Sequence, residues 1–405
     1  MKDLRADFPQ LNRKIHGKRL IYLDSTATSL KPRQVIAKEQ EYYTSYCANI
    51  FRGIYTTSEE ATAAYELART NVARFIGAAH PSEIVFTRNA SESINLVMNA
   101  LSRTNLHGSE MVTTIMEHHS NFVPWQQLAL GFGVPFRVWN VDASGALPLK
   151  DIEQVVTKKT KILAVTAVSN VLGTINPIRK IRQIAKRINP RCLVLVDAAQ
   201  AAPHMKIDVQ DWGADIVAFS SHKMLGPTGV GVLWARKELL EEFSPYQYGG
   251  EMIKEVHVDR TVFAGPPHKF EAGTPHIAGV IGLGAAVDYL SGIGMDAIRN
   301  HEIEITGYAL KSLASVKGVD IYGPTNANDR GGVIAFTMVG THAHDIAQLL
   351  NEDNVCIRAG HHCAMPLHEF LKIPATARAS FYVYTTKSDV DALVVGLEKI
   401  KQLFK

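Results

Sequence analysis

The segments CLVLVDAAQ (192–200) and IVAFSSHKMLGPTGVGVLWA (216–235) decide the fold of this chain. Each contains apolar runs rich in Val, Leu and Ile, and such uninterrupted runs are typical of strands buried on both faces of a sheet. The first run ends at Asp197, and Lys223 stands between the two runs of the second segment. The pattern predicts parallel strands with polar side chains beyond their carboxyl ends, where α/β proteins bind ligands.

Similar runs recur along the first two thirds of the chain and alternate with helical patterns. They predict strands at 83–87, 111–116, 135–141, 161–168, 192–197, 216–221 and 229–235. We expect a mainly parallel sheet with helices on both faces, within a large α/β domain of residues 21–285.

The pattern changes after about residue 285. A helix is predicted at 295–316, with short strands at 319–323, 332–339, 355–359 and 380–385. The closing helix carries one apolar stripe, formed by Val390, Leu393, Leu397, Ile400 and Phe404. These elements predict a small α+β domain over residues 286–405, on which the N-terminal segment 1–20 packs.

Composition narrows the class of protein. The chain has 405 residues, of which 46% are hydrophobic and 20% charged, as in ordinary globular proteins. The net charge is only +4 and no basic block is present, so we expect no nucleic-acid partner. No segment approaches the roughly 20 apolar residues of a membrane span, and the polar start predicts a cytoplasmic protein. Four cysteines without CxxC spacing predict reduced thiols.

Lys223 and Asp197 together suggest a cofactor. Taken singly, each is more often a solvated or ion-paired residue at a strand end. Pyridoxal phosphate, however, requires a lysine that forms a Schiff base and an acid that keeps the pyridine nitrogen protonated. The pair therefore predicts a pyridoxal phosphate site.

A phosphate site is predicted where the strand in FTRNASESIN (86–95) passes into a helix. Ala90 and Ser91 lie at the turn, where free backbone N–H groups and the positive helix end favour an anion. A simple serine cap is the alternative. The hydroxyls of Ser220 and Thr274 and the ring of His222 offer further donors.

Two adjacent histidines follow another strand, in MEHHSN (116–121). Either His118 or His119 has a flat ring suited to stacking on a cofactor and to passing protons near neutral pH. A structural role is equally open for each.

A cysteine-containing loop, RAGHHCAMPLH (358–368), follows a predicted strand. Cationic neighbours favour the thiolate form of a cysteine, which is the nucleophile, and Cys363 has Arg358, His361 and His362 close in sequence. A transition-metal site is the alternative. Adjacent side chains rarely converge on one ion, so no metal is expected.

Arg378, in ARAS (377–380), is predicted to begin a strand. Its guanidinium is suited to holding a substrate carboxylate by two parallel hydrogen bonds, and Arg358 is a second candidate for this role. A surface arginine is the alternative.

Seven motifs occur in order over nearly the whole chain: LDSTATSLKP, MEHHSN, VSNVLGT, VDAAQ, SSHKMLGPTGVG, FEAGTP and RAGHHCAMPLH. This ordered set resembles the SufS-type cysteine desulfurases, in the class V branch of the fold type I pyridoxal phosphate enzymes. The resemblance implies a homodimer with the cofactor near the subunit interface. It implies Lys223 as the Schiff-base lysine, His118 on the cofactor ring, Asp197 on its nitrogen, Gln200 on its hydroxyl, Ala90, Ser91, Ser220 and His222 on the phosphate with Thr274 of the other subunit, Asn170 and Arg378 on the substrate carboxylate, and Cys363 as sulfur acceptor.

The implied reaction converts L-cysteine to L-alanine and leaves a persulfide on Cys363. A SufE- or SufU-like acceptor protein would then carry the sulfur to iron–sulfur cluster assembly, and the histidines of THAHD (341–345) are candidates for docking it. Phe51, Tyr55, Ser221, His276 and the pair Ala198–Ala199 depart from the pattern of many relatives. Selenocysteine lyase, with L-selenocysteine as substrate, another class V enzyme and a non-catalytic scaffold remain alternatives.

Overall fold

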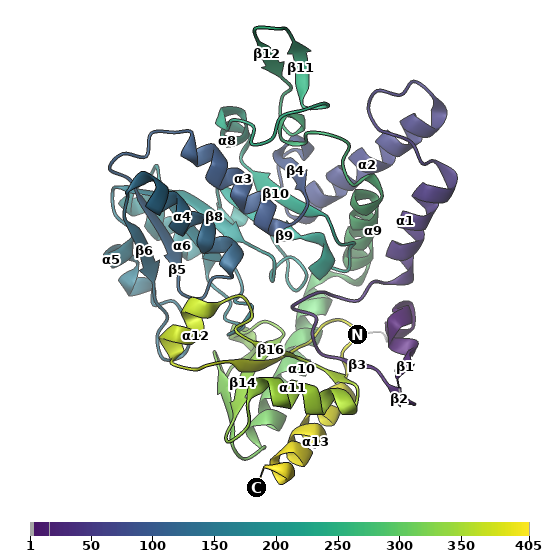
Figure 1. Cartoon of the computed structure of the whole chain (residues 1–405), viewed down its shortest axis with the longest axis vertical. Helices are drawn as coiled ribbons and strands as arrows, with labels where there is room; N and C mark the ends of the chain where they lie inside the picture. The colour runs from purple at the N-terminus through teal and green to yellow at the C-terminus, as the bar shows by residue number, and fades with distance from the viewer. Residues whose placement is uncertain (1–3, 16, 405) are drawn as a thin grey trace.

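A seven-stranded sheet forms the centre of the larger unit in the computed structural model, which describes residues 4–15 and 17–404 (Figure 1). Its order is β4-β10-β9-β8-β7-β5-β6, and only β10 runs against the others. The strands are β4 (Ile84–Thr87), β5 (Glu110–Thr114), β6 (Phe136–Trp139), β7 (Thr160–Thr166), β8 (Leu193–Asp197), β9 (Ile216–Ser220) and β10 (Gly231–Ala235). All seven predicted strands are present, and the mainly parallel α/β prediction is confirmed.

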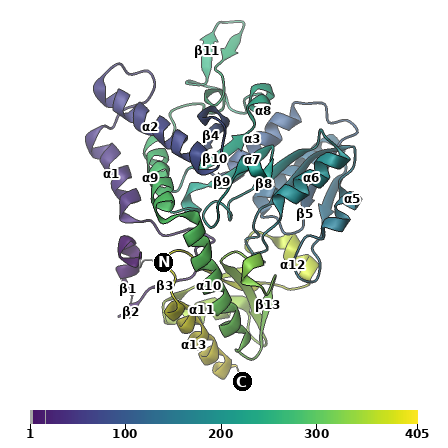
Figure 2. The same cartoon turned by 180° about the vertical axis from the view of Figure 1, so that it is seen from behind.

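Helices cover both faces of this sheet. One face carries α3 (Ala90–Ser102), α4 (Val123–Phe132) and α8 (Lys237–Glu242), with α3 and α4 in front in Figure 1. The other face, seen in Figure 2, carries α2 (Thr56–Phe75), α5 (Ile152–Val155), α6 (Ile178–Ile188), α7 (Val209–Trp212) and α9 (Ile277–Ile293), and α1 (Arg33–Ser45) packs on α9.

Strand β7 shows why the apolar runs are uninterrupted. Ile162 and Ala164 belong to the core on one face, while Leu163 and Val165 belong to the core on the other. Full burial of such an aliphatic side chain contributes about 1.5–3 kcal/mol. Both sets of alternating positions are therefore apolar.

The smaller unit has an antiparallel sheet of order β13-β14-β17-β16. Its strands are β13 (Val319–Tyr322), β14 (Val333–Met338), β16 (Arg358–Gly360) and β17 (Thr376–Ser380). Its apolar core is shared with the helices α10 (Met295–Ala314), α11 (Ala343–Glu352) and α13 (Lys387–Leu403). The predicted helix at 295–316 and the predicted closing helix are confirmed.

Four predictions in this unit are wrong in detail. Residues 381–385 form no strand, because the strand is β17 and its apolar continuation fills the core between the two units. Arg378 therefore lies in the middle of β17 and not at a strand start. The predicted strand 355–359 is divided into β15 (Val355–Cys356), which pairs with β3 (Ile21–Tyr22), and β16. Phe404 lies beyond α13 and is half exposed, so it is not part of the buried stripe.

Two features relate to the predicted domains: the N-terminal segment and the junction between the larger and the smaller unit. Arg5 and Arg19 both form ion pairs with Asp389 of α13. The predicted boundary at residue 285 lies inside α9, and the sharp bend between α9 and α10 measures 75°. The domain boundaries stay a prediction.

Two hairpins and one helix lie outside these layers. They are the hairpin β1 (Lys14–Ile15) and β2 (Lys18–Arg19), the projecting hairpin β11 (Ile253–Val256) and β12 (Thr261–Phe263) at the top of Figure 1, and, after Cys363, the helix α12 (Met365–Leu371). Among the described residues no single helix meets the length and hydropathy of a membrane span, and α9 and α10 do so only as the bent pair.

Candidate active site

A cavity of about 320 Å³ lies where the carboxyl ends of the large sheet meet the small unit. Its walls include most of the predicted site residues, namely Ala90, Ser91, His118, Asn170, Asp197, Ser220, His222, Lys223, Arg358, Cys363 and Arg378. Two predicted residues, Gln200 and Thr274, are not among its lining residues. The volume is within the range of small-molecule sites.

Parallel strands place the large-domain residues. Asp197 is the last residue of β8 and Ser220 the last of β9. Ala90 begins α3 after β4, and His118 follows β5. Because these strands end at one edge of the sheet, side chains more than 100 positions apart in sequence converge on one cavity.

Lys223 and Asp197 influence each other's charge. Desolvation lowers the pKa of Lys223, an effect that Asp197 opposes. Desolvation also raises the pKa of Asp197, which Lys223 opposes, and Asp197 Oδ1 accepts a hydrogen bond from the Ala199 N–H at 2.9 Å. A lysine with a lowered pKa is more readily available as a neutral amine, the form that acts as nucleophile or base.

The loop of Lys223 is held by residues 28–31 of the motif LDSTATSLKP, for which the sequence predicted no role. The His222 carbonyl oxygen accepts hydrogen bonds from Thr28 Oγ1 at 3.0 Å and from Lys31 Nζ at 2.8 Å. It also accepts from the backbone N–H and the hydroxyl of Ser29, at 3.0 and 3.1 Å. The segment lies about 190 positions from His222 in sequence, and no local pattern links the two.

The helix start predicted for phosphate has the expected geometry with a different cap. Asn89, not a serine, is the N-cap of α3. The Ala90 N–H donates to Ser220 Oγ at 2.9 Å, and the Ser91 hydroxyl is hydrogen-bonded to that of Ser120. Ser120, which the sequence-based prediction did not select, also lines the cavity.

The two adjacent histidines have different positions. His118 lines the cavity, and its Nδ1 accepts a hydrogen bond from the Ser120 N–H at 3.1 Å. Burial, with a smaller effect of the charge on Lys223, lowers the pKa of His118 to about 3, so the ring is neutral with its proton on Nε2. His119 instead contacts the cysteine loop: its N–H donates to the Cys363 carbonyl at 2.7 Å, and its Nε2 accepts from the Met365 N–H at 3.0 Å.

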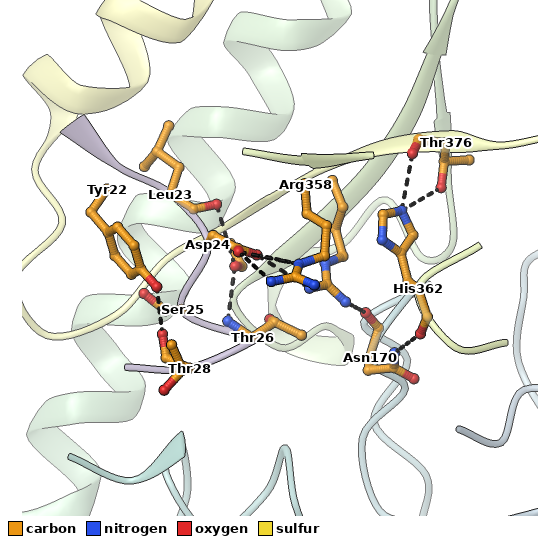
Figure 3. Close-up of polar contacts among 12 residues, drawn as sticks. Tyr22, Leu23, Asp24, Ser25, Thr26, Thr28, Asn170, Arg358, His362 and Thr376 are labelled. Carbon is orange, nitrogen blue, oxygen red and sulfur yellow. Dashed lines mark hydrogen bonds and ion pairs between the residues drawn. The ribbon is translucent and has the colours of Figure 1, made fainter. Parts of the chain in front are cut away.

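The Cys363 loop is fixed at several points. Cys363 is exposed at the cavity wall, and both His362 and Cys363 have positive φ angles, 51° and 57°, which are uncommon for residues other than glycine. The Asn170 amide donates to the His362 carbonyl at 2.8 Å, and His362 Nε2 is hydrogen-bonded to Thr376 Oγ1 at 2.9 Å (Figure 3). Among the described residues, no three His, Cys, Asp or Glu side chains form a metal-binding group.

The two arginines share one carboxylate, that of Asp24 (Figure 3). Arg358 and Arg378 are register partners on β16 and β17. Arg378 is 3% exposed, and its Nη1 donates to the Asn170 carbonyl at 3.0 Å. Burial lowers the pKa of Arg378 to about 10. The Asn170 and Arg378 predicted for the substrate carboxylate are therefore in direct contact.

Gln200 and Thr274 do not line the cavity, and the contact of Gln200 with the cofactor hydroxyl stays a prediction. Gln200 is buried, and its amide donates to the Thr26 carbonyl at 2.9 Å, so it supports a residue of the cavity wall. Thr274 is exposed and lines a separate hollow. Its role toward a second subunit stays a prediction.

Comparison with known proteins identifies the family. Residues 21–393 match the family model described as aminotransferase class-V, and the chain therefore belongs to this family. A probable cysteine desulfurase of Streptomyces coelicolor is 51% identical, over 99% of this chain and 97% of the relative.

Two solved structures agree with the sequence relatives. The cysteine desulfurase of Thermococcus onnurineus has a TM-score of 0.93 at 41% identity, covering 99% of this chain and 97% of that one. The cysteine desulfurase CsdA of Escherichia coli, in an S-sulfonic acid form, has a TM-score of 0.90 at 36% identity, covering 99% and 98%. The predicted resemblance to cysteine desulfurases is confirmed.

The cavity fits pyridoxal phosphate, the cofactor that membership of this family supports. Lys223 supplies an amine of lowered pKa, and Asp197 a buried carboxylate. The start of α3, with Ser91 and His222 nearby on the wall, supplies hydrogen-bond donors for a phosphate group.

Proposed function

We propose that this chain is a pyridoxal phosphate-dependent cysteine desulfurase that converts L-cysteine to L-alanine and keeps the sulfur as a persulfide on Cys363. One observation carries the proposal: Cys363 and Lys223 line the same cavity although they lie 140 positions apart. A class V enzyme that only transfers amino groups has no use for an exposed thiol in this position.

Each half of the cavity has a separate task. Lys223 would bind the cofactor covalently, with Asp197 on its ring nitrogen, His118 against its ring and the start of α3 at its phosphate. When bound, pyridoxal phosphate supplies an electron sink for a carbanion at the substrate Cα. Arg378 and Asn170 would hold the substrate carboxylate, and the Lys223 amine would remove the Cα proton.

Cys363 then acts as the nucleophile. Its thiolate sulfur attacks the sulfur of the substrate, so a new S–S bond forms while the substrate Cβ–S bond breaks. The bonding electron pair stays with the three-carbon fragment, which takes up protons and leaves as alanine. The persulfide remains on Cys363, on an exposed loop from which a second protein can remove it.

The same proposal includes the SufS type, a homodimer and a cytoplasmic location. It also includes sulfur transfer through a SufE- or SufU-like acceptor to iron–sulfur clusters. Hydrogen bonds from Asn170 and to His119 hold the cysteine loop in place. This supports a short, fixed loop that an acceptor protein has to approach. His342 and His344 are exposed at the start of α11, with ring centroids 5.0 Å apart, which supports the hypothesis that they help to dock the acceptor.

The decisive experiment compares Cys363→Ser with a matched control, Cys47→Ser, because Cys47 is also an exposed free cysteine but lies outside the cavity. Serine keeps the volume but cannot ionise near neutral pH. We expect Cys363→Ser to change its cofactor absorbance on adding cysteine, yet to release almost no alanine and to carry no persulfide. Cys47→Ser should match the wild type.

Alanine and persulfide are measured by amino-acid analysis and mass spectrometry. Near wild-type alanine release from cysteine by Cys363→Ser would exclude the proposed mechanism. Release of selenide and alanine from L-selenocysteine alone would instead identify a selenocysteine lyase, and a keto-acid product would identify an aminotransferase.

A further inference from the structure

Asp24 lies in LDSTATSLKP but has no predicted role. It follows β3, and its backbone forms a parallel bridge with Ser380 of β17, while the Thr26 N–H donates to Ser380 Oγ at 3.0 Å. Its side chain is 14% exposed. The backbone on both sides of Asp24 is therefore fixed against the strand that carries Arg378.

One carboxylate serves two arginines. Arg358 Nη2 lies 3.0 Å from Asp24 Oδ2, and Arg358 Nε also donates to this carboxylate. Arg378 Nη2 lies 3.3 Å from Asp24 Oδ1. Figure 3 shows Arg358 directed at Asp24.

The strand register makes this counter-ion necessary. Arg358 and Arg378 are directly opposite each other on β16 and β17, and like charges in such a pair destabilise a sheet. Arg378 is also almost fully buried, which makes an unpaired guanidinium costly. Asp24 compensates one of the two positive charges, so the three side chains keep one positive charge at the cavity wall. That charge matches a single substrate carboxylate.

We infer that Asp24 is a positioning residue for the substrate carboxylate: as the shared counter-ion of Arg358 and Arg378, it orients the Arg378 guanidinium and sets the charge of this wall. The inference rests on the proposed function, because it assumes an α-amino acid substrate. Asn170 supports the same orientation from the other side, since its carbonyl accepts from Arg378 Nη1.

The test measures KM and kcat for cysteine in the holoenzyme of Asp24→Asn, Asp24→Glu and Arg358→Gln, with the dissociation constant of alanine from a cofactor absorbance titration. Asp353→Asn is the matched control, because Asp353 also joins two cations, Lys18 at 2.6 Å and Lys399 at 2.7 Å, outside the cavity. Thermal midpoints are recorded for all variants.

We expect Asp24→Asn to raise KM and the alanine dissociation constant about tenfold, because this factor corresponds to the loss of one charge-assisted contact. The value of kcat should change less than about twofold. Asp24→Glu should recover most of this loss, and Asp353→Asn should match the wild type. Arg358→Gln removes the charge left for the substrate and should raise KM about threefold to tenfold.

The double variant Asp24→Asn/Arg358→Gln separates positioning from a general effect on folding. It again has one positive charge, on Arg378, so its KM should be no higher than that of Asp24→Asn. Effects that multiply would show that the three residues do not act as a unit. An unchanged KM in Asp24→Asn would overturn the inference, and a lower KM would show that Asp24 competes with the substrate. An inactive wild type would instead reject the proposed function.

Discussion

The two sides of the cavity are built in different ways. On the large-domain side, Asp197, Ser220 and Ala90 stand directly at the ends of strands or the start of a helix, so the sheet itself fixes them. On the small-domain side, Cys363 stands on a loop held by side chains of distant segments, among them His119 and Asn170. The cofactor side is therefore determined by secondary structure, and the sulfur side by tertiary contacts.

The largest expected effect is on the cofactor side, where one side chain performs several steps. Lys223→Ala should lower alanine release from cysteine by at least about a hundredfold, since it removes the amine that binds the cofactor and moves the proton. Alanine release at saturating cysteine is the measurement. Lys269→Ala is the control, because burial also lowers the pKa of Lys269 but that residue lies outside the cavity.

Borohydride reduction of the wild type should fix the cofactor to Lys223, as peptide mapping will show. A label on another lysine, or full activity in Lys223→Ala, would contradict the assignment and remove the contrast between the two sides.

A smaller effect is expected from Arg378, which belongs to the small domain but serves the substrate. Arg378→Ala should raise KM for cysteine by about tenfold to a hundredfold, because a charge-assisted pair is lost, with a lesser change in kcat. The KM of Arg378→Lys should lie between those of the wild type and Arg378→Ala, since lysine keeps the charge but not the planar fork. Steady-state kinetics measures both. Unchanged KM and kcat would show that another group binds the carboxylate.

The smallest effect concerns the anchor of the cysteine loop and its dependence on pH. His119 Nε2 accepts from the Met365 N–H only when the ring is neutral, and burial, with a smaller effect of His361, lowers the pKa of His119. The unfolded chain therefore takes up a proton near pH 6.5 before the folded chain does, and stability falls as the pH drops through this value. Glutamine accepts the same hydrogen bond without titrating.

We expect the thermal midpoint of the wild type to fall more than that of His119→Gln between about pH 7 and pH 5. His119→Ala, which cannot accept the bond, should have the lower midpoint already at pH 7. Parallel pH curves for wild type and His119→Gln would show that this contact does not stabilise the loop.

Much of the fold was predictable because its signals are local. The runs 162–165 of β7 and 193–196 of β8 contribute alternate residues to the cores on the two faces, so all of these positions are apolar and the strand is evident without knowledge of its neighbours. The same reasoning was wrong for 380–385, where Tyr382 and Tyr384 are equally buried but pack between the units and form no ladder. An apolar run reports burial, and burial alone does not distinguish a strand from a core-filling loop.

The residues of the candidate site likewise divide into those that a local sequence pattern predicted and those that it did not. Lys223, Asp197 and Cys363 were selected because their residue types and positions after predicted strands suggest chemistry. Asp24 and Ser120 were not selected, because an aspartate and a serine in polar segments are common. No residue near either of them in sequence indicates that it needs an ion-pair or hydrogen-bond partner there.

The sequence by itself determined the strands of the large sheet, and with them the edge at which Asp197 and Lys223 lie. The reason is that an uninterrupted apolar run is a property of residues adjacent in sequence. Only the tertiary structure decided that His118 faces the cavity while His119 holds the loop, and that Arg358 and Arg378 share Asp24. Such contacts depend on segments more than 100 positions apart, whose relative placement follows from the packing of the whole chain and not from any local pattern.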